Sequence, residues 1–306
     1  MNEYKKIIRS AKVRHTILEA LRFIPDKQMI ELQYRIKMGR KLNLRNPQSY
    51  TEKLQWYKLY YRDPLMTKCA DKHQVREYLA SRGYGDLPCE EYGIYDKPEE
   101  IPFDKLPDRF VIKTTNGSGT NIICTDKKRL DIQSTVTELA DWLKRDCYGL
   151  GREWAYKDIE PKIVVEEFLE DKANSFEGIN DYKFICFNGK VYYVVFDADR
   201  YVGHKRSIYD ADWNYIDVGT DCEKLGDVVS KPEGFDEMKK IAEDLSSEFP
   251  SVRVDLYWVN HRAYFGELTF YPWTGYVVFD PESFDYEVGQ NFKLPEKLIG
   301  GGIAKK

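Results

Sequence analysis

Two short segments near the C-terminal end carry four polar side chains in a pattern that could bind a metal ion. Arg253 and Asp255 occur in SVRVDLYWV, and Glu267 and Thr269 occur in RAYFGELTF. Both segments alternate apolar and polar residues, which predicts two half-buried strands. If residues 260–262 form the hairpin loop between the strands, Asp255 lies opposite Glu267 and Arg253 lies opposite Thr269.

Two carboxylates that face each other across an antiparallel pair repel, because their Cβ atoms lie roughly 5 Å apart. A divalent cation between Asp255 and Glu267 would remove this repulsion. Mg²⁺ prefers oxygen ligands and often takes one or two protein carboxylates together with substrate phosphates. Arg253, on the same face, could then hold a phosphoryl oxygen. The alternative is an exposed sheet face whose charges point into water.

A second segment, DRFVIKTTNGSGTNIICT, has the composition of a phosphate-binding loop. Residues 110–113 and 122–124 are predicted to form short strands on either side of small polar residues. Such a loop can direct several backbone N–H groups at an anion, and Lys113 enters it as a point charge. It is not a Walker motif, because the lysine precedes the glycines and the loop joins two strands. The alternative is an ordinary hairpin turn.

Together with three further segments, in this order along the chain, these features resemble the ATP-grasp ligases. Lys72, in ADKHQVREYL, matches the first nucleotide-binding lysine of that family, at the start of a predicted helix. Lys113, in FVIKTTNGSGTN, matches the second lysine. The family's flexible glycine loop corresponds to Asn116, Gly117, Ser118, Gly119 and Thr120.

The resemblance also implies where the nucleoside would bind. VVEEFLED is similar to the family's hinge, where one acid and the backbone of the following residues receive adenine, which implicates Glu166, Glu167 and Leu169. DYKFICFNGK resembles the strand that follows the hinge, with Asp181 as the acid that binds the ribose.

The two C-terminal strands are similar to the metal-binding strands of the D-alanine:D-alanine ligases. In this resemblance Asp255, Glu267 and Thr269 are metal ligands, and Arg253 and Lys113 are catalytic. Thr269 stands where most members carry Asn, and its hydroxyl is a poorer metal ligand than an amide carbonyl. The resemblance therefore supports a first Mg²⁺ and leaves open whether a second one binds.

PQSYTEKLQWYKLYYRDPLMTKCADKHQVREY, followed far downstream by GELTFYPWTG, resembles the teichuronopeptide-biosynthesis branch of this superfamily. The resemblance implies an α+β, ATP-grasp fold in which two α+β subdomains clasp ATP, with a helical N-terminal extension. We expect a basic helical region over residues 1–62, the N-terminal and small subdomains with the glycine loop over 63–165, and the large subdomain with the metal hairpin over 166–306.

Members of that branch occur with bacterial surface-polysaccharide synthesis and are regarded as amide ligases. The resemblance therefore implies an enzyme that uses ATP and Mg²⁺ to activate a carboxylate on a glycan or sugar precursor and join it to an amine or amino acid. An ATP-grasp-type kinase, in which the phosphoryl group stays on the acceptor, needs the same ATP site. A non-catalytic carbohydrate-binding protein is a third alternative. Tyr271, Trp273 and Tyr276 are candidates for stacking on a sugar, although aromatic core is the commoner role.

Charge is distributed unevenly along the 306 residues, whose net charge is −4. Residues 1–45 hold 12 Lys or Arg against 4 Asp or Glu, so this basic segment could contact an anionic membrane surface or a lipid-linked acceptor. The alternative is a solvated helix packed on its own domain. No run of 18 apolar residues and no signal peptide occurs, so we expect a cytoplasmic protein without a transmembrane segment, positioned at the inner face of the membrane if that contact forms. The six scattered cysteines are typical of reduced thiols, and no nucleic-acid partner is expected.

Capping and turn residues predict the elements around these motifs. Ser49 with Glu52 forms a capping box for a helix that Pro64 ends, and a second helix holds Lys72. Thr135 with Glu138 predicts another capping box. Two further elements are expected, a hairpin over 181–197 around Asn188-Gly189 and a helix over 235–248.

Overall fold

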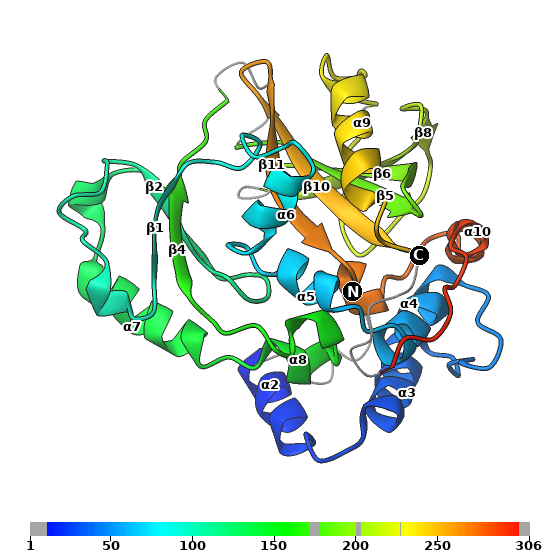
Figure 1. The fold of residues 1–306 in the computed structure, drawn as a ribbon. Coiled ribbons are helices and arrows are strands. Elements are labelled where there is room, and N and C mark those ends of the chain that lie inside the picture. Colours follow the sequence, from blue (N-terminus) through cyan, green and yellow to red (C-terminus); the bar gives the residue numbers. More distant parts are fainter. Residues whose placement is uncertain (1–10, 172–177, 200–202, 227, 300–306) are drawn as a thin grey trace.

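The computed structural model describes residues 11–171, 178–199, 203–226 and 228–299 of the chain (Figure 1). Helices and two antiparallel sheets are both present, which confirms the predicted α+β class. The α-helices are α2 (Ala11–Ala20), α3 (Asp26–Met38), α4 (Tyr50–Tyr60), α5 (Pro64–Ala70), α6 (Val75–Ser81), α7 (Ile132–Leu143), α8 (Cys147–Gly151), α9 (Phe235–Ser246) and α10 (Ser283–Asn291).

The smaller sheet has four antiparallel strands in the order β1-β4-β2-β3. These strands are β1 (Glu91–Tyr95), β2 (Phe110–Thr114), β3 (Asn121–Cys124) and β4 (Ile163–Glu167). One face packs on Leu139 and Trp142 of α7, at the left of Figure 1. Because side chains alternate along a strand, Val111 and Lys113 of β2 are on the other face. The proposed division between residues 165 and 166 falls inside β4, and the domain limits stay a prediction.

The larger sheet has the strand order β11-β10-β5-β6-β7-β8, with β9 paired in parallel to β7. Its strands are β5 (Asp181–Phe187), β6 (Lys190–Ala198), β7 (Lys205–Asp210), β8 (Tyr215–Ile216), β9 (Glu223–Lys224), β10 (Val252–Val259) and β11 (Arg262–Thr269). Helix α9 covers one face, where the Phe184 and Phe235 rings lie 6.0 Å apart. Alternation then places the charged residues of β5 and β10 on the opposite face. The hairpin predicted around Asn188-Gly189 and the helix predicted before β10 are both present.

The predicted capping box starts α4, because the Ser49 side chain accepts the Glu52 N–H and the Glu52 side chain accepts the Ser49 N–H. Pro64 does not end this helix. Instead, α4 stops at Tyr60, and Pro64 begins α5 behind the Asp63 cap, as proline can because the first turn lacks internal N–H partners.

Two helix predictions are wrong for reasons of local capping. Lys72 lies in a turn between α5 and α6, where the Asp71 carboxylate accepts the N–H groups of His73 and Gln74 at 2.8 and 2.9 Å. Helix α7 begins after Asp131, whose side chain accepts the Ser134 N–H, so Thr135 lies inside the helix and does not cap it.

Candidate functional site

The β10–β11 hairpin brings its four predicted site residues together. Asp255 pairs with Glu267 and Arg253 pairs with Thr269, as the sequence predicted. The loop is nevertheless shorter than predicted, because Asn260 and His261 alone form it, both with positive φ.

A β-bulge compensates for the shorter loop. Leu256 pairs with Phe265, so Gly266 is the extra residue that restores the predicted register at Glu267. A Cβ at Gly266 would lie 3.0 Å from the Asp255 carbonyl oxygen and 3.2 Å from the Tyr257 ring. Glycine therefore permits the bulge that sets the facing carboxylates.

Arg253 occupies the space between the two carboxylates. Its Nε and Nη2 donate to both oxygens of Asp255 at 2.7 Å, and Nη2 also donates to Glu267 Oε1 at 2.9 Å. Nη2 further contacts the Thr269 hydroxyl at 3.1 Å. The repulsion expected from the sequence is thus already relieved by a guanidinium.

Lys183 of β5 is a second cation on this face. Its Nζ donates to Asp255 Oδ2 at 2.8 Å and to the Asp181 carboxylate. Burial opposes the charged form, but Asp181 and Asp255 raise the pKa of Lys183. Burial likewise opposes ionisation of Glu267, yet Arg253 and the nearby lysines lower the pKa of Glu267 to about 2. Burial raises the pKa of Asp255, while Arg253 and Lys183 act in the opposite direction.

The protein oxygen atoms at this site could hold one Mg²⁺ only if a substrate supplied further ligands. Among the described residues, no three His, Cys, Asp or Glu side chains are grouped as a metal site. Asp255, Glu267 and the Thr269 hydroxyl supply oxygen atoms from two facing strands, and both hydrogen bonds to Glu267 use Oε1. Such a set suits an ion that takes its remaining ligands from phosphate and water.

The glycine loop joins β2 and β3 and lies beside both predicted lysines. Lys113 Nζ pairs with Glu166 Oε2 at 2.6 Å, and Lys72 Nζ donates to the Gly117 carbonyl. Gly117 and Gly119 both have positive φ, and a Cβ at Gly117 would lie 2.4 Å from Cys147 Sγ.

Two polar side chains of the glycine loop are buried, and a third lines a cavity. Asn116 and Thr120 are buried, where Asn116 Nδ2 contacts Cys147 Sγ and Thr120 Oγ1 lies 2.8 Å from Thr114 Oγ1. Ser118 lines a cavity.

The two lysines differ in their electrostatic surroundings. Burial opposes the charged form of Lys113, but Glu166 raises its pKa. Burial lowers the pKa of Lys72. The charge of Glu267 acts to raise this pKa, and the charge of Lys113 acts to lower it. Lys72 contacts the glycine loop at Gly117 and lines a small cavity together with Phe265 and Gly266 of β11.

A largely apolar cavity of about 390 Å³ lies between the smaller sheet and β10. We call it the slot. Its lining includes Val111, Lys113, Glu167, Leu169 and Tyr257. A flat apolar group fits such a slot, with the backbone after β4 at its edge.

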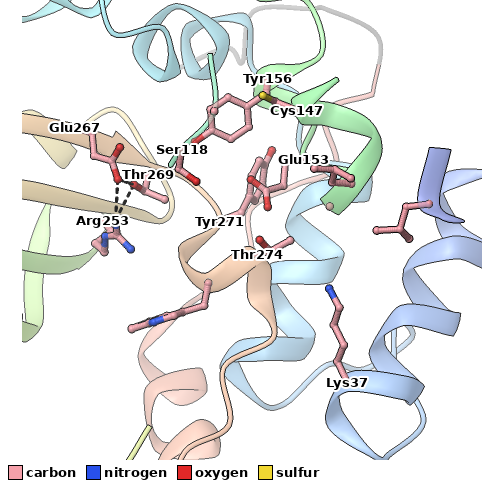
Figure 2. A pocket seen from close by; sticks show the side chains of 15 residues that line it. Lys37, Ser118, Cys147, Glu153, Tyr156, Arg253, Glu267, Thr269, Tyr271 and Thr274 are labelled. Atoms are coloured by element: carbon pink, nitrogen blue, oxygen red, sulfur yellow. Dashed lines mark hydrogen bonds and ion pairs between the residues drawn. The ribbon is translucent and has the colours of Figure 1, made fainter. Parts of the chain in front are cut away.

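A second cavity, of about 380 Å³, opens on the other side of the glycine loop (Figure 2). We call it the acceptor cavity. Arg253, Glu267 and Thr269 lie on its left in Figure 2, and Lys37 of α3 enters from the lower right. The other residues that line it are Leu18, Gly117, Ser118, Cys147, Leu150, Gly151, Glu153, Tyr156, Tyr271, Trp273 and Thr274.

The sequence matches the family model described as TupA-like ATPgrasp over residues 52–293. The chain belongs to this family. The α+β fold described above is therefore an ATP-grasp fold. No curated protein matches the sequence.

Three solved structures with similar folds are each distant from this chain in sequence. D-alanine–D-alanine ligase from Bacillus anthracis is 18% identical, with 66% of this chain and 57% of that one covered and a TM-score of 0.40. Phosphoribosylamine–glycine ligase from Thermotoga maritima is 13% identical, with 76% and 57% covered and a TM-score of 0.41. A RimK domain ATP-grasp protein from Sphaerobacter thermophilus is 10% identical, with 74% and 69% covered and a TM-score of 0.40. The chain thus spans little more than half the length of the two named ligases.

Two residues predicted to contact the nucleoside have other partners in this ATP-grasp chain. Glu166 does not line the slot and instead binds Lys113, while Glu167 and Leu169 do line it. Asp181 is 1% exposed and its carboxylate binds Lys183. The nucleoside contacts of Glu166 and Asp181 stay a prediction.

Sequence reasoning missed several residues of the TupA-like site. Lys183 follows Asp181 by two positions on the same strand face, which the alternation of a strand could have revealed. Lys37, Glu153 and Tyr156 come from segments far from every motif, and nothing in the sequence marked them as neighbours of Arg253.

Proposed function

We propose that this ATP-grasp protein is an ATP-dependent carboxylate–amine ligase that works through an acyl phosphate. One observation carries the proposal. The slot and the acceptor cavity both adjoin the glycine loop, with Lys113 lining the slot, Arg253 lining the acceptor cavity and Lys72 bonded to the loop at the Gly117 carbonyl. An enzyme that moves a phosphoryl group needs this order of base site, phosphate site and acceptor site.

Within this proposal the slot receives the adenine ring of ATP. The backbone from Glu167 to Leu169 borders the slot and supplies N–H and C=O groups for the ring edge. Lys72 and Lys113 bind the phosphates, assisted by the backbone N–H groups of residues 116–120.

Asp255 and Glu267, with the Thr269 hydroxyl, would hold Mg²⁺. When bound, the ion would offset the negative charge of the ATP phosphates. Arg253 and Lys183 stabilise the charge that moves from ATP to the acceptor carboxylate, because both cations are fixed in place by buried acids.

The acceptor carboxylate binds beside Arg253 in the acceptor cavity. Its oxygen attacks the γ-phosphorus and ADP leaves, which gives the carboxylate a good leaving group. An amine then attacks the carbonyl carbon and inorganic phosphate departs. This route needs no covalent enzyme nucleophile, consistent with the absence from the sequence of any Ser/His/Asp or Cys/His motif.

We propose a carboxylate-bearing glycan or sugar precursor as the acceptor, in the assembly of a bacterial surface polysaccharide. Trp273 supports this choice, because it lines the acceptor cavity and is half-buried, with the Arg206 guanidinium 5.4 Å from its ring. Tyr271 is 1% exposed and Tyr276 is 6% exposed, so most of each ring belongs to the core. Of the three candidates, Trp273 is therefore the strongest for stacking on a sugar ring.

We propose that the protein acts on the cytoplasmic side of the membrane. Helices α2 and α3 would then make a peripheral contact with the anionic membrane surface. Val13, Ile17, Phe23, Leu32 and Ile36 are exposed on this helical pair or the turn that joins its helices. Part of the basic N-terminal segment, including Ile7 and Ile8, lies outside the described residues. Within the described residues, no helix is long and apolar enough to cross a bilayer. Salt-sensitive co-sedimentation with anionic but not neutral vesicles tests this contact, and equal binding to both would refute it.

The function is tested by incubating the protein with ATP, Mg²⁺, candidate uronates and a panel of amino acids, and analysing the products by mass spectrometry. A ligase gives a condensed product together with ADP and phosphate. A stable phosphorylated acceptor formed without amine would establish the kinase alternative, and ATP binding without any product would favour the non-catalytic one.

A further inference from the structure

A second group of charged residues lies at the acceptor cavity and has no part in the proposed phosphoryl transfer. Glu153, just before the short helix η3 (Trp154–Tyr156), and Lys37 both line the cavity. Lys58 of α4 lies nearby and is only 1% exposed. A lysine buried to this degree is costly unless it is hydrogen-bonded, so its partners indicate what it holds.

Lys58 joins the two backbone segments that shape this end of the cavity. Its Nζ donates to the Gly151 carbonyl at 2.9 Å and to the Thr274 carbonyl at 2.8 Å. Gly151 ends α8, two residues before Glu153, and Thr274 lies in η4 (Pro272–Gly275), which follows β11 and its Glu267. Lys58 thus fixes the position of Glu153 relative to the strand that carries Glu267.

The backbone around Glu153 is shaped to leave room for its carboxylate. A Cβ at Gly151 would lie 2.7 Å from Glu153 Oε1 and 2.5 Å from Thr274 Cγ2, so a larger residue there would displace both side chains. Trp273 and Thr274 have positive φ angles of 53° and 55°, a backbone conformation that is strained for non-glycine residues. Strain of this kind persists where the surrounding contacts fix the backbone.

Glu153 has the surroundings of a proton acceptor. Burial raises the pKa of Glu153, while Lys58 and a hydrogen bond from Thr274 act in the opposite direction. A carboxylate with a raised pKa is a better base for an ammonium group than an exposed one. Besides Lys58, the titratable groups whose charges interact with Glu153 are those of Lys37, Glu267, Tyr156, Tyr271 and Cys147.

Lys37 supplies a cation to the same end of the cavity. Its Nζ lies 4.0 Å from the centroid of the Tyr276 ring, which holds the side chain on the cavity side of α3 (Figure 2). Lys37 and Glu153 line the same cavity, and the charge of Lys37 partly offsets the burial that raises the pKa of Glu153. A carboxylate and an ammonium group that line one cavity suit a ligand that carries both an ammonium and a carboxylate group.

We propose that this end of the acceptor cavity binds an amino acid as the amine substrate, with Glu153 on its ammonium group and Lys37 on its carboxylate. The inference rests on the proposed ligase function. Glu153 takes one proton from the ammonium, and the free amine attacks the carbonyl carbon of the acyl phosphate. The C–N bond forms and the C–O bond to phosphate breaks. The second nitrogen proton leaves with inorganic phosphate.

Hydroxylamine separates the role of Glu153 from carboxylate activation, because it captures acyl phosphates as hydroxamates and carries no ammonium to deprotonate near neutral pH. We expect Glu153→Gln to lose about 100-fold in kcat/KM for the amino acid, while hydroxamate formation stays close to that of the unsubstituted protein. Glu138→Gln, at an exposed position of α7, is the matched control and should change neither rate.

Each other outcome of this experiment contradicts one claim. Equal loss of amide and hydroxamate would overturn the role of Glu153, and so would retention of both. Absence of hydroxamate from the unsubstituted protein would instead overturn the proposed function.

The carboxylate site is tested with Lys37→Met and paired donors. The amino acid identified by mass spectrometry is compared with its carboxamide, which keeps the amine and lacks the charged carboxylate. We expect the substitution to raise the KM of the amino acid about 10-fold and to leave that of the carboxamide unchanged, since one charge-assisted hydrogen bond is lost. Lys27→Met, on the same helix with an exposed side chain, is the control. Equal effects on both donors would contradict the assignment.

Discussion

The Arg253 guanidinium binds the Asp255 carboxylate through two parallel hydrogen bonds of 2.7 Å, at a position where Asp255 is only 1% exposed. Removing one member of this pair would leave a buried charge with fewer partners. A buried charge left without its partner destabilises far more than two facing carboxylates do.

Asp255→Asn is accordingly expected to lower the free energy of unfolding by about 3 kcal/mol. The measurement is urea unfolding without nucleotide, with Asp244→Asn, outside the site, as the control. The sequence alone suggests the opposite sign, because removing one of two facing carboxylates would relieve repulsion. An unchanged or higher unfolding free energy would show that the Arg253–Asp255 pair does not stabilise the protein.

The glycine loop gives a matched pair of substitutions. Gly117 and Gly119 both have positive φ, but a Cβ at Gly117 meets Cys147 Sγ at 2.4 Å, whereas one at Gly119 meets nothing within 4 Å. We expect Gly119→Ala to cost about 1 kcal/mol and Gly117→Ala to cost more in unfolding free energy. Adding Cys147→Ala to Gly117→Ala should remove the extra cost in unfolding free energy, so that the double variant costs about as much as Gly119→Ala. Equal costs for both single variants would contradict the close contact with Cys147.

Nucleotide should order the same loop. Residues 114–120 are small and polar, and we expect their amide exchange to slow when ATP and Mg²⁺ are added together. The measurement is hydrogen exchange by mass spectrometry, repeated with EDTA to remove the metal. If residues 114–120 exchange at the same rate in all three conditions, the loop is an ordinary turn.

Lys58 predicts a dependence of stability on pH. Burial lowers the pKa of Lys58 to about 7, whereas lysine in an unfolded chain titrates near 10.4. Between these values the unfolded chain binds more protons than the folded one, so the contribution of Lys58 to stability increases with pH.

The stability of the unsubstituted protein relative to Lys58→Met should therefore rise between pH 7 and pH 10, by at most about 1.4 kcal/mol per pH unit. Urea unfolding at several pH values gives this difference, and Lys27→Met should show no such slope. A difference that stays constant between pH 7 and pH 10 would mean that Lys58 stays charged in the folded state.

Local sequence patterns predicted the parts of the site that lie on single strands. Strand alternation with a loop assumed over residues 260–262 was sufficient to pair Asp255 with Glu267, and the glycines after Lys113 were sufficient to frame the loop between β2 and β3. The pairing was correct although the loop was predicted one residue too long, because the bulge at Gly266 restores the register.

Long-range relationships could not be predicted in the same way. Sequence spacing does not show that Lys58 of α4 reaches the carbonyls of Gly151 and Thr274, or that Arg253 takes the place expected for a cation. Such contacts depend on how α3, α4 and η3 pack against β11, which no periodicity encodes.

The most direct test of the central claim follows oxygen atoms from acceptor to phosphate. The acceptor is prepared with ¹⁸O in its carboxylate and incubated with ATP, Mg²⁺ and the amino acid, and the released phosphate is analysed by mass spectrometry. A ligase that forms an acyl phosphate transfers one ¹⁸O to each phosphate, because the C–O bond of the acceptor breaks. Condensed product formed alongside unlabelled phosphate would contradict carboxylate activation, and a phosphorylated acceptor that keeps all its ¹⁸O without amide formation would identify a kinase.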